Sequence, residues 1–205
     1  MIIYHFSNGK KNINIKVMKI WIPKIILFFI IITKLFGQDM IIFKPSMNIG
    51  LENWRIVNDD VMGGISKSYI SLNDENNMLF NGYLSLENRG GFASCRNSLS
   101  EKIPKDTTKF KIRVKGDGRT YQFRLRMRNT YANYAVNFKT IKNEWIDVEI
   151  SMDEFKAYIM GARRPLSPKL KAEKISSIGF LLADKKEGNF GLEIMHVIAT
   201  TEVAF

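Results

Sequence analysis

The chain has 205 residues, of which 45% are hydrophobic, and carries a formal net charge of +11 at pH 7. Six of its 31 basic residues lie in the first 37 positions, which contain no acid, so the remaining 168 residues have 25 basic against 20 acidic side chains. That balance does not indicate a nucleic-acid partner, and 168 residues suit one domain with a sizeable core. The single cysteine, Cys95, excludes an internal disulfide, and we expect it to be a buried small hydrophobe.

The N-terminal segment has the pattern of an export signal. Six lysines flank an uninterrupted apolar run at 25–32, which fits the roughly 7 to 15 residues of a signal-peptide core and is shorter than the ~20 that span a bilayer. We therefore expect residues 1–37 to be a signal peptide and the protein to be exported to the periplasm or cell envelope. The alternative is an anchor in the inner membrane formed by residues 20–36, which would be the chain's only membrane contact.

The exact start and the cleavage point follow from small local features. Met18 is an alternative start to Met1, because a compact signal then opens at that position. Cleavage after the small residue Gly37 would leave Gln38 at the new terminus. Residues 38–205 are then expected to form the single folded domain.

The clearest periodicity in this domain is two, which predicts β-strands. Between 109 and 128 apolar residues alternate with polar, mostly basic ones in two runs, separated by Asp117 and Gly118. A type I′ turn at these two residues predicts a hairpin with every apolar side chain on one face. Further strands are predicted at 79–86, 92–96, 134–138, 146–150, 175–182 and 190–198.

The segment 153–171 contains two prolines and no sustained period. It is expected to be a long loop, apart from a helical turn at 153–158. The number and spacing of the predicted strands indicate an all-β domain that forms a sandwich.

The predicted hairpin places like charges opposite each other on its outer face. Lys111 would lie across from Arg124, and a second lysine across from Arg126. Because such pairs are unfavourable, compensation is expected from water and salt, from carboxylates such as Asp147 and Glu149, or from an anionic partner. Both arginines are expected to be exposed, so replacing them with serine should leave the fold intact.

Several acids lie next to glycine-rich turns, and their expected roles are structural. Asp59 or Asp60 is expected to cap a turn, Asp117 to begin its hairpin turn, and Glu87 with Asn88 to satisfy backbone groups at a strand end. A calcium site or a pair of catalytic carboxylates about 5 to 10 Å apart are the alternatives. No metal site, cofactor or catalytic residue is predicted.

Two further residues are candidates for binding. Arg96 ends an alternating segment, and a buried arginine there would need a carboxylate such as Glu87. Trp145 shares the outer face of its strand with two acids, where an exposed indole could contact a glycan or a protein. The predicted binding residues are Asp60, Glu87, Asn88, Arg96, Arg124, Arg126 and Trp145.

Two glycine-rich runs carry a family resemblance. They are Asp60-Val61-Met62-Gly63-Gly64-Ile65-Ser66 and Ser85-Leu86-Glu87-Asn88-Arg89-Gly90-Gly91-Phe92-Ala93-Ser94. Other matching positions are Trp54, Arg96, Gly116-Asp117-Gly118-Arg119, Tyr121, Trp145, Ile178-Gly179-Phe180, Phe190 and Leu192-Glu193-Ile194. Together they resemble the NADH:ubiquinone oxidoreductase (complex I) intermediate-associated protein 30 family, in a bacterial-type single-domain form.

The resemblance implies a galactose-binding-domain-like jelly-roll β-sandwich and a non-enzymatic role like that of complex I assembly chaperones. The expected partner is a protein, either a respiratory-complex subunit or another envelope protein. The alternative is an exported carbohydrate-binding module with a glycan partner. A row of exposed aromatic side chains beside Trp145 would favour the glycan, and a large apolar patch would favour the protein.

Overall fold

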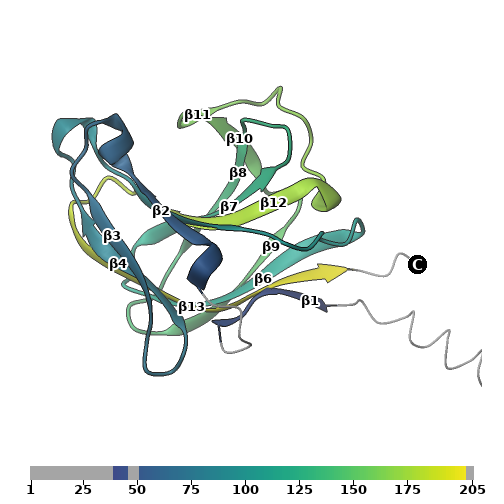
Figure 1. The fold of residues 1–205 in the computed structure, drawn as a ribbon, viewed down its shortest axis with the longest axis horizontal. Helices are drawn as coiled ribbons and strands as arrows, with labels where there is room; N and C mark the ends of the chain where they lie inside the picture. Colours follow the sequence, from purple (N-terminus) through teal and green to yellow (C-terminus); the bar gives the residue numbers. More distant parts are fainter. Residues whose placement is uncertain (1–38, 46–50, 202–205) are drawn as a thin grey trace, which may run out of the picture. The chain divides into compact units, whose positions relative to one another are not determined.

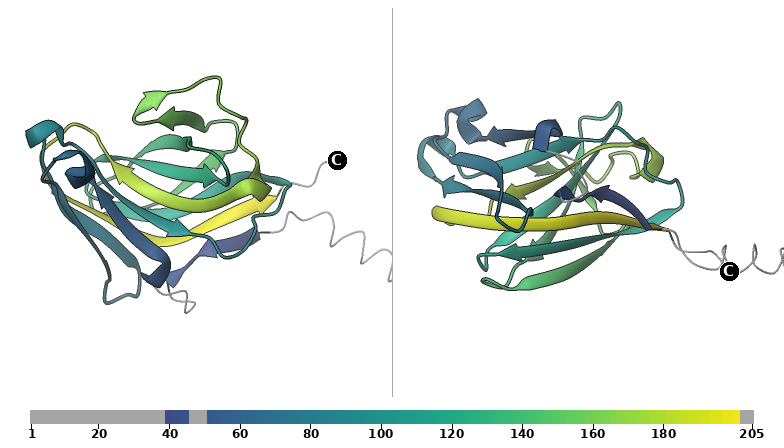
Figure 2. Two further views of the ribbon diagram at one scale, coloured as in Figure 1. Left: turned by 45° about the horizontal axis from the view of Figure 1, so that its top comes forward. Right: turned by 60° about the horizontal axis from the view of Figure 1, so that its bottom comes forward.

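The computed structural model describes residues 39–45 and 51–201, so the predicted leader, residues 1–37, lies outside the described residues. Two antiparallel sheets pack face to face within these ranges (Figures 1 and 2). Sheet A contains β1 (Asp39–Phe43), β3 (Lys67–Leu72), β4 (Met78–Leu84), β6 (Thr107–Gly116), β9 (Trp145–Ser151) and β13 (Gly188–Thr201). Sheet B contains β2 (Trp54–Asn58), β5 (Ala93–Ser98), β7 (Thr120–Met127), β8 (Asn133–Lys139), β10 (Lys156–Ile159), β11 (Ala162–Arg163) and β12 (Ile175–Leu182).

The strand order shows how the sandwich closes. Sheet A runs β3-β4-β13-β6-β9, with β1 also paired to β13, and sheet B runs β11-β10-β8-β7-β12-β5-β2. Short 3-10 helices precede or connect strands: η2 (Leu51–Asn53), η3 (Asp59–Met62), η4 (Glu87–Arg89) and η5 (Ala172–Lys174). Within the described ranges, no helix has the length and apolar character needed to cross a membrane.

The core between the sheets is rich in aromatic rings. Phe110 on β6 and Phe123 on β7 contact each other from opposite sheets, with ring centroids 5.7 Å apart. Phe155, between β9 and β10, packs against both rings. Since burying one such side chain contributes roughly 1.5–3 kcal/mol, these inward-facing rings are the main force that joins the two sheets.

The predicted hairpin in 109–128 is wrong, although both alternations in it are present. The apolar residues of β6 and β7 are buried as expected. However, β6 pairs with β9 and β13 in sheet A, whereas β7 pairs with β8 and β12 in sheet B. Asp117 and Gly118 therefore carry the chain from one sheet to the other. Alternation identifies the apolar face of a strand, and two such faces can pack against each other as well as lie side by side.

The predicted opposition of Lys111 and Arg124 is wrong for the same reason. Lys111 lies opposite Glu149 on β9, and Arg124 lies on the other sheet. The compensating carboxylates expected from the sequence do occur on the outer face of sheet A. The ion pairs there include Lys109–Glu149 at 3.1 Å, Lys111–Asp39 at 3.8 Å, Arg113–Asp147, and Lys115–Glu193 at 2.8 Å.

Other predictions about elements had mixed outcomes. The strand predicted at 175–182 coincides with β12, and Cys95 is buried as expected. The segment 153–171 contains β10 and β11 where a loop with a helical turn was expected. Strands of two and four residues have too few alternating positions to be recognised from their sequence. Strands β1, β2 and β3 were also not predicted.

Candidate functional site

The two glycine-rich runs meet at a buried carboxylate. The side chain of Asp59 is fully buried at the start of η3. It accepts hydrogen bonds from the backbone N–H groups of Ser66 (3.0 Å), Gly91 (2.7 Å) and Phe92 (3.2 Å), and also from the Ser66 hydroxyl. Asp59 thus ties the loop after η3 to the loop after η4, a structural role close to the predicted turn cap.

The glycines of these runs leave room for that carboxylate. A Cβ on Gly64 would lie 2.4 Å from Cγ of Asp59, and a Cβ on Gly90 would lie 2.7 Å from its Oδ2. Burial raises the pKa of Asp59, but the hydrogen bonds from Ser66 and Gly91 outweigh that effect and hold the pKa below its ordinary value. The motif residues therefore keep an ionised carboxylate inside the fold, and they do not form an open site.

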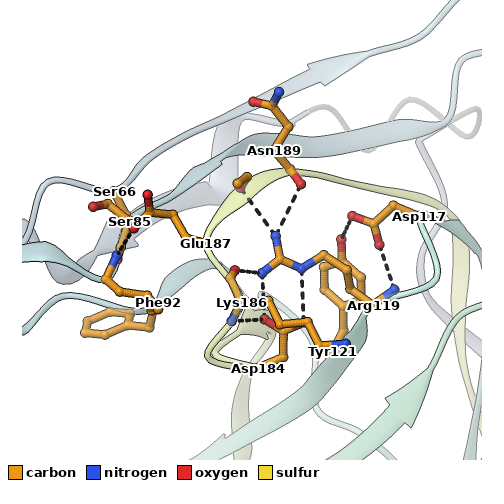
Figure 3. Close-up of polar contacts among 12 residues, drawn as sticks. Ser66, Ser85, Phe92, Asp117, Arg119, Tyr121, Asp184, Lys186, Glu187 and Asn189 are labelled. Carbon is orange, nitrogen blue, oxygen red and sulfur yellow. Dashed lines mark hydrogen bonds and ion pairs between the residues drawn. The ribbon is translucent and has the colours of Figure 1, made fainter.

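A second polar cluster holds the crossing from β6 to β7 (Figure 3). Arg119 forms two hydrogen bonds with Asp184, from Nε to Oδ2 at 3.0 Å and from Nη2 to Oδ1 at 2.6 Å. The same guanidinium donates to the backbone carbonyls of Lys186, Gly188 and Asn189. Because these contacts occupy its donors, Arg119 anchors the β12–β13 connection to the start of β7.

Asp117 belongs to the same cluster. Its carboxylate accepts hydrogen bonds from the Tyr121 hydroxyl (3.0 Å), the Gly191 backbone (3.0 Å) and the Arg119 backbone (3.0 Å). The expectation that Asp117 begins a hairpin turn is replaced by this role at the crossing between sheets. Asp59, Asp117 and Asp184 are thus committed to internal contacts.

Three predicted site residues lie on exposed loops. Asp60 is exposed on η3, and Glu87 and Asn88 are exposed on η4. Among the residues that the structure describes, no three His, Cys, Asp or Glu side chains come together as metal ligands. Nothing in the geometry gives Asp60, Glu87 or Asn88 a ligand, and a binding role for them stays a prediction.

Trp145 lies on the outer face of sheet A, as its strand pattern predicts. It is opposite Lys115, whose Nζ lies 5.2 Å from the centre of the indole ring. The indole is therefore partly covered, and its neighbour across the strand pair is charged. These surroundings differ from the aromatic row that would have favoured a glycan at this position.

The structure brings three other predicted residues together on the outer face of sheet B. Arg55 of β2 lies opposite Arg96 of β5, and Gly179 of β12 lies between Arg96 and Arg124 of β7. Arg126 follows two residues along β7. Residues in register or two apart on a strand project from the same face, so these four arginines form one surface, which we call the arginine face.

Neutral groups, and no carboxylates, contact three of these guanidiniums. Nη2 of Arg96 lies 3.2 Å from Oδ1 of Asn133, and Nε of Arg124 lies 3.0 Å from Oε1 of Gln122. Nε of Arg126 lies 3.4 Å from the carbonyl oxygen of Thr130. The ion pairs found among the described residues include none of the three.

Two predictions about these arginines are therefore corrected. The expected ion pair between Arg96 and Glu87 is absent from the described residues, because the polar partner of Arg96 is an amide on β8. Arg124 and Arg126 are partly buried where full exposure was expected. β7 lies between β8 and β12, and side chains on these neighbouring strands cover part of both arginines. The predicted two-strand hairpin did not include these neighbours.

Burial and mutual repulsion both act on the charges of this face. Desolvation, assisted by the nearby charge of Arg96, lowers the pKa of Arg124 to about 10. Desolvation also lowers the pKa of Arg96, assisted by the charge of Arg126. A guanidinium with a pKa of about 10, as in Arg124, is still protonated at neutral pH, so the face holds concentrated positive charge that an anion would stabilise.

A surface pocket of about 820 Å³ opens on this face. Arg124 lies outside its lining, which among the described residues contains four arginines, namely Arg55, Arg96, Arg126 and Arg128, and no acid. Two of them, Arg55 and Arg128, were not selected from the sequence, nor was Tyr131, which projects into solvent at the pocket edge. Arg55 could have been placed on the outer face from the sequence, because it stands between Trp54 and Ile56, two apolar residues that face inward.

Comparison with known proteins is consistent with this architecture. Residues 43–194 match the family model described as Complex I intermediate-associated protein 30. The chain belongs to this family. A curated relative, the mitochondrial Complex I intermediate-associated protein 30 of Mus musculus, is 29% identical over 190 residues, covering 82% of this chain and 58% of the mouse protein. The chain thus spans less than two thirds of the length of the mouse protein.

Several solved structures with a similar fold are carbohydrate-binding modules. A family 11 module of a cellulosomal cellulase from Clostridium thermocellum has a TM-score of 0.59 at 16% identity, covering 82% of this chain and 96% of the module. A family 29 module has a TM-score of 0.52 at 9% identity, covering 81% of this chain and 87% of the module. The predicted galactose-binding-like jelly-roll β-sandwich is confirmed, and these likenesses concern the fold alone.

Proposed function

We propose that this protein is a non-enzymatic binding module that assists the assembly of a respiratory complex by holding a partner protein. Membership of the intermediate-associated protein 30 family supports an assembly role. The observation that carries the binding role is the arginine face. Three of its four arginines line an open pocket, and none of the four forms an ion pair with a carboxylate of the described residues. Such a face is electrostatically incomplete until an anionic group occupies it.

The contacts of the three acids in the two polar clusters support a non-catalytic role. Asp59, Asp117 and Asp184 are each held by internal hydrogen bonds. Catalytic acids instead face a substrate site with a free oxygen. In this protein these three acids stabilise loops, and the charged groups that line the open pocket are arginines, which suit binding of an anionic partner.

Export, or anchoring by residues 20–36, is part of the proposal and is motivated by the lysine-flanked apolar run of the leader. An exported domain could assist membrane-embedded subunits from the outer side of the membrane. The carbohydrate-binding alternative draws on the fold of the similar structures. The lysine that partly covers Trp145 weakens this alternative at the position where the sequence suggested a glycan platform.

Affinity capture tests this proposal. The tagged, full-length protein would be recovered from gently solubilised envelopes of its own host, and its N-terminus would be read by mass spectrometry. Recovery of respiratory-complex subunits is the expected result, and an intact leader would identify an anchored form. A chain that begins at Gln38 and brings down no protein would contradict the assembly role and favour a glycan-directed module.

A further inference from the structure

We propose that the arginine face binds an extended acidic segment of a partner protein, with its carboxylates paired to Arg96, Arg124 and Arg126. This inference rests on the proposed assembly function and specifies the chemistry of the partner. The segment would enter the pocket of about 820 Å³, which Arg96 and Arg126 line, and would reach Arg124 on the neighbouring surface of sheet B, outside that lining. It would continue past the β7–β8 loop.

The donors that remain on these arginines match carboxylates. Each guanidinium spends one nitrogen on a neutral group, namely Nη2 of Arg96, Nε of Arg124 and Nε of Arg126. Both terminal nitrogens of Arg124 and of Arg126 therefore remain for a ligand. A guanidinium and a carboxylate form a planar, charge-assisted pair with two hydrogen bonds, which is stronger than a bond between neutral groups.

The spacing of the arginines suits an extended peptide. Arg96 and Arg124 are separated by one intervening strand, which corresponds to roughly 10 Å at ~4.8 Å per strand. Arg124 and Arg126 are two residues apart on one strand, about 7 Å. Because an extended chain advances ~3.3 Å per residue, acids two or three residues apart in the partner would reach successive arginines.

The positive surface continues beyond the first pocket. A second pocket of about 520 Å³ shares residues 127–130 with it. Basic side chains dominate its lining, and its one acid is Glu173. The basic residues are Lys102, Arg128, Lys169, Lys171 and Lys174. A ligand that follows both pockets must therefore be an elongated polyanion.

The lining favours a peptide over other polyanions. Val57, Leu99 and Met127 line the first pocket among the arginines, so the ligand should offer apolar side chains as well as carboxylates. Tyr131 is the one aromatic residue in that lining, whereas a single-stranded nucleic acid needs successive stacking platforms. A flat membrane surface does not enter a pocket, and neutral sugars would leave the guanidiniums unpaired.

Fluorescence anisotropy of a labelled peptide with the full-length protein in mild detergent tests the inference. The probe is a ten-residue peptide of alternating Glu and Thr, and a peptide of alternating Gln and Thr is its uncharged control. We expect the acidic peptide to bind, the control not to bind, and the affinity to fall as salt rises. The double variant Arg96→Gln with Arg126→Gln should weaken binding by about tenfold or more.

A matched variant separates this face from general charge. Lys111→Gln with Arg113→Gln removes the same charge from the outer face of sheet A and should change the affinity less than about twofold, apart from a small long-range effect. Equal weakening by both double variants, or equal binding of both peptides, would overturn the inference. Tighter, Arg96-dependent binding of polygalacturonate or oligouridylate than of the acidic peptide would overturn the assignment to a protein segment.

The envelope capture distinguishes this inference from the assembly proposal. If the Arg96→Gln with Arg126→Gln variant recovers the same subunits as the unaltered protein, assembly stands and the arginine face is not the docking site. If the acidic peptide binds as expected but no subunit is captured, the face is supported and the assembly role fails.

Discussion

Replacing Asp59 with Asn should destabilise the fold strongly, because its carboxylate is the acceptor for two loops. One carboxylate oxygen accepts the N–H groups of Gly91 and Phe92 together with the hydroxyl of Ser66. If the amide nitrogen of the new side chain took the place of this oxygen, it would face three donors and could accept none of them. If the amide oxygen took that place, the donors would keep an acceptor, but the negative charge that strengthens these hydrogen bonds would be lost. Leaving buried donors without a partner costs about 1–3 kcal/mol each, so the loss should be roughly 3–5 kcal/mol.

That loss is a large fraction of the ~5–15 kcal/mol by which domains are stable. Urea unfolding followed by the fluorescence of the buried Trp54 would measure it. Asp60→Asn is the matched control, since this neighbour is exposed and its replacement should change the unfolding free energy by less than about 0.5 kcal/mol. If Asp59→Asn were as mild as Asp60→Asn, the structural account of the glycine-rich motifs would be wrong.

The same carboxylate predicts a pH dependence. The pKa of Asp59 is lower in the folded protein than its ordinary value, so the folded state holds fewer protons on this group than the unfolded state does. The ionised Asp59 therefore contributes fully to the free energy of unfolding above its pKa in the unfolded chain, about 3.9. This contribution is lost as the pH falls through its lower pKa in the folded protein. The stability difference between the unaltered protein and Asp59→Asn should shrink over that acidic range, and a difference that grew there would contradict the assignment.

Three further substitutions test other parts of the structure. Arg119→Ala should lower the unfolding free energy by about 3–5 kcal/mol because it leaves a buried carboxylate unpaired, and loss of less than about 1 kcal/mol would refute that role. Gly64→Ala should cost about 1–3 kcal/mol or more, since its Cβ would meet Asp59, as thermal unfolding can show. Arg124→Ser with Arg126→Ser should leave the melting temperature unchanged or higher because like charges are removed, and an unfolded variant would contradict the placement of both residues.

Local features of the sequence determined much of the sandwich. The alternation in β6 and β7 identified the apolar faces correctly, because the side chains of a strand alternate whatever its neighbours are. The same reasoning placed Trp145 outward with Asp147 and Glu149. Strands too short to alternate, such as β10, gave no comparable signal.

The pairing of strands was decided only by the tertiary structure. A turn-like Asp117-Gly118 between two alternating runs is compatible with a hairpin and with a crossing between sheets, and the contacts that select the crossing come from β13 and from the segment after β12. Asp59 likewise acquires its role from donors that lie 32 and 33 residues further along the chain.

The candidate site shows the same division. Arg124 and Arg126 were selected together from the predicted hairpin, and Arg96 for a separate local reason, so nothing local related β5 to β7. Strand order places β12 between them, and Gly179 at that point lets the three guanidiniums share one face. Residue type and alternation are properties of a segment, whereas the concentration of charge is a property of strand order, which depends on contacts between segments far apart in the chain.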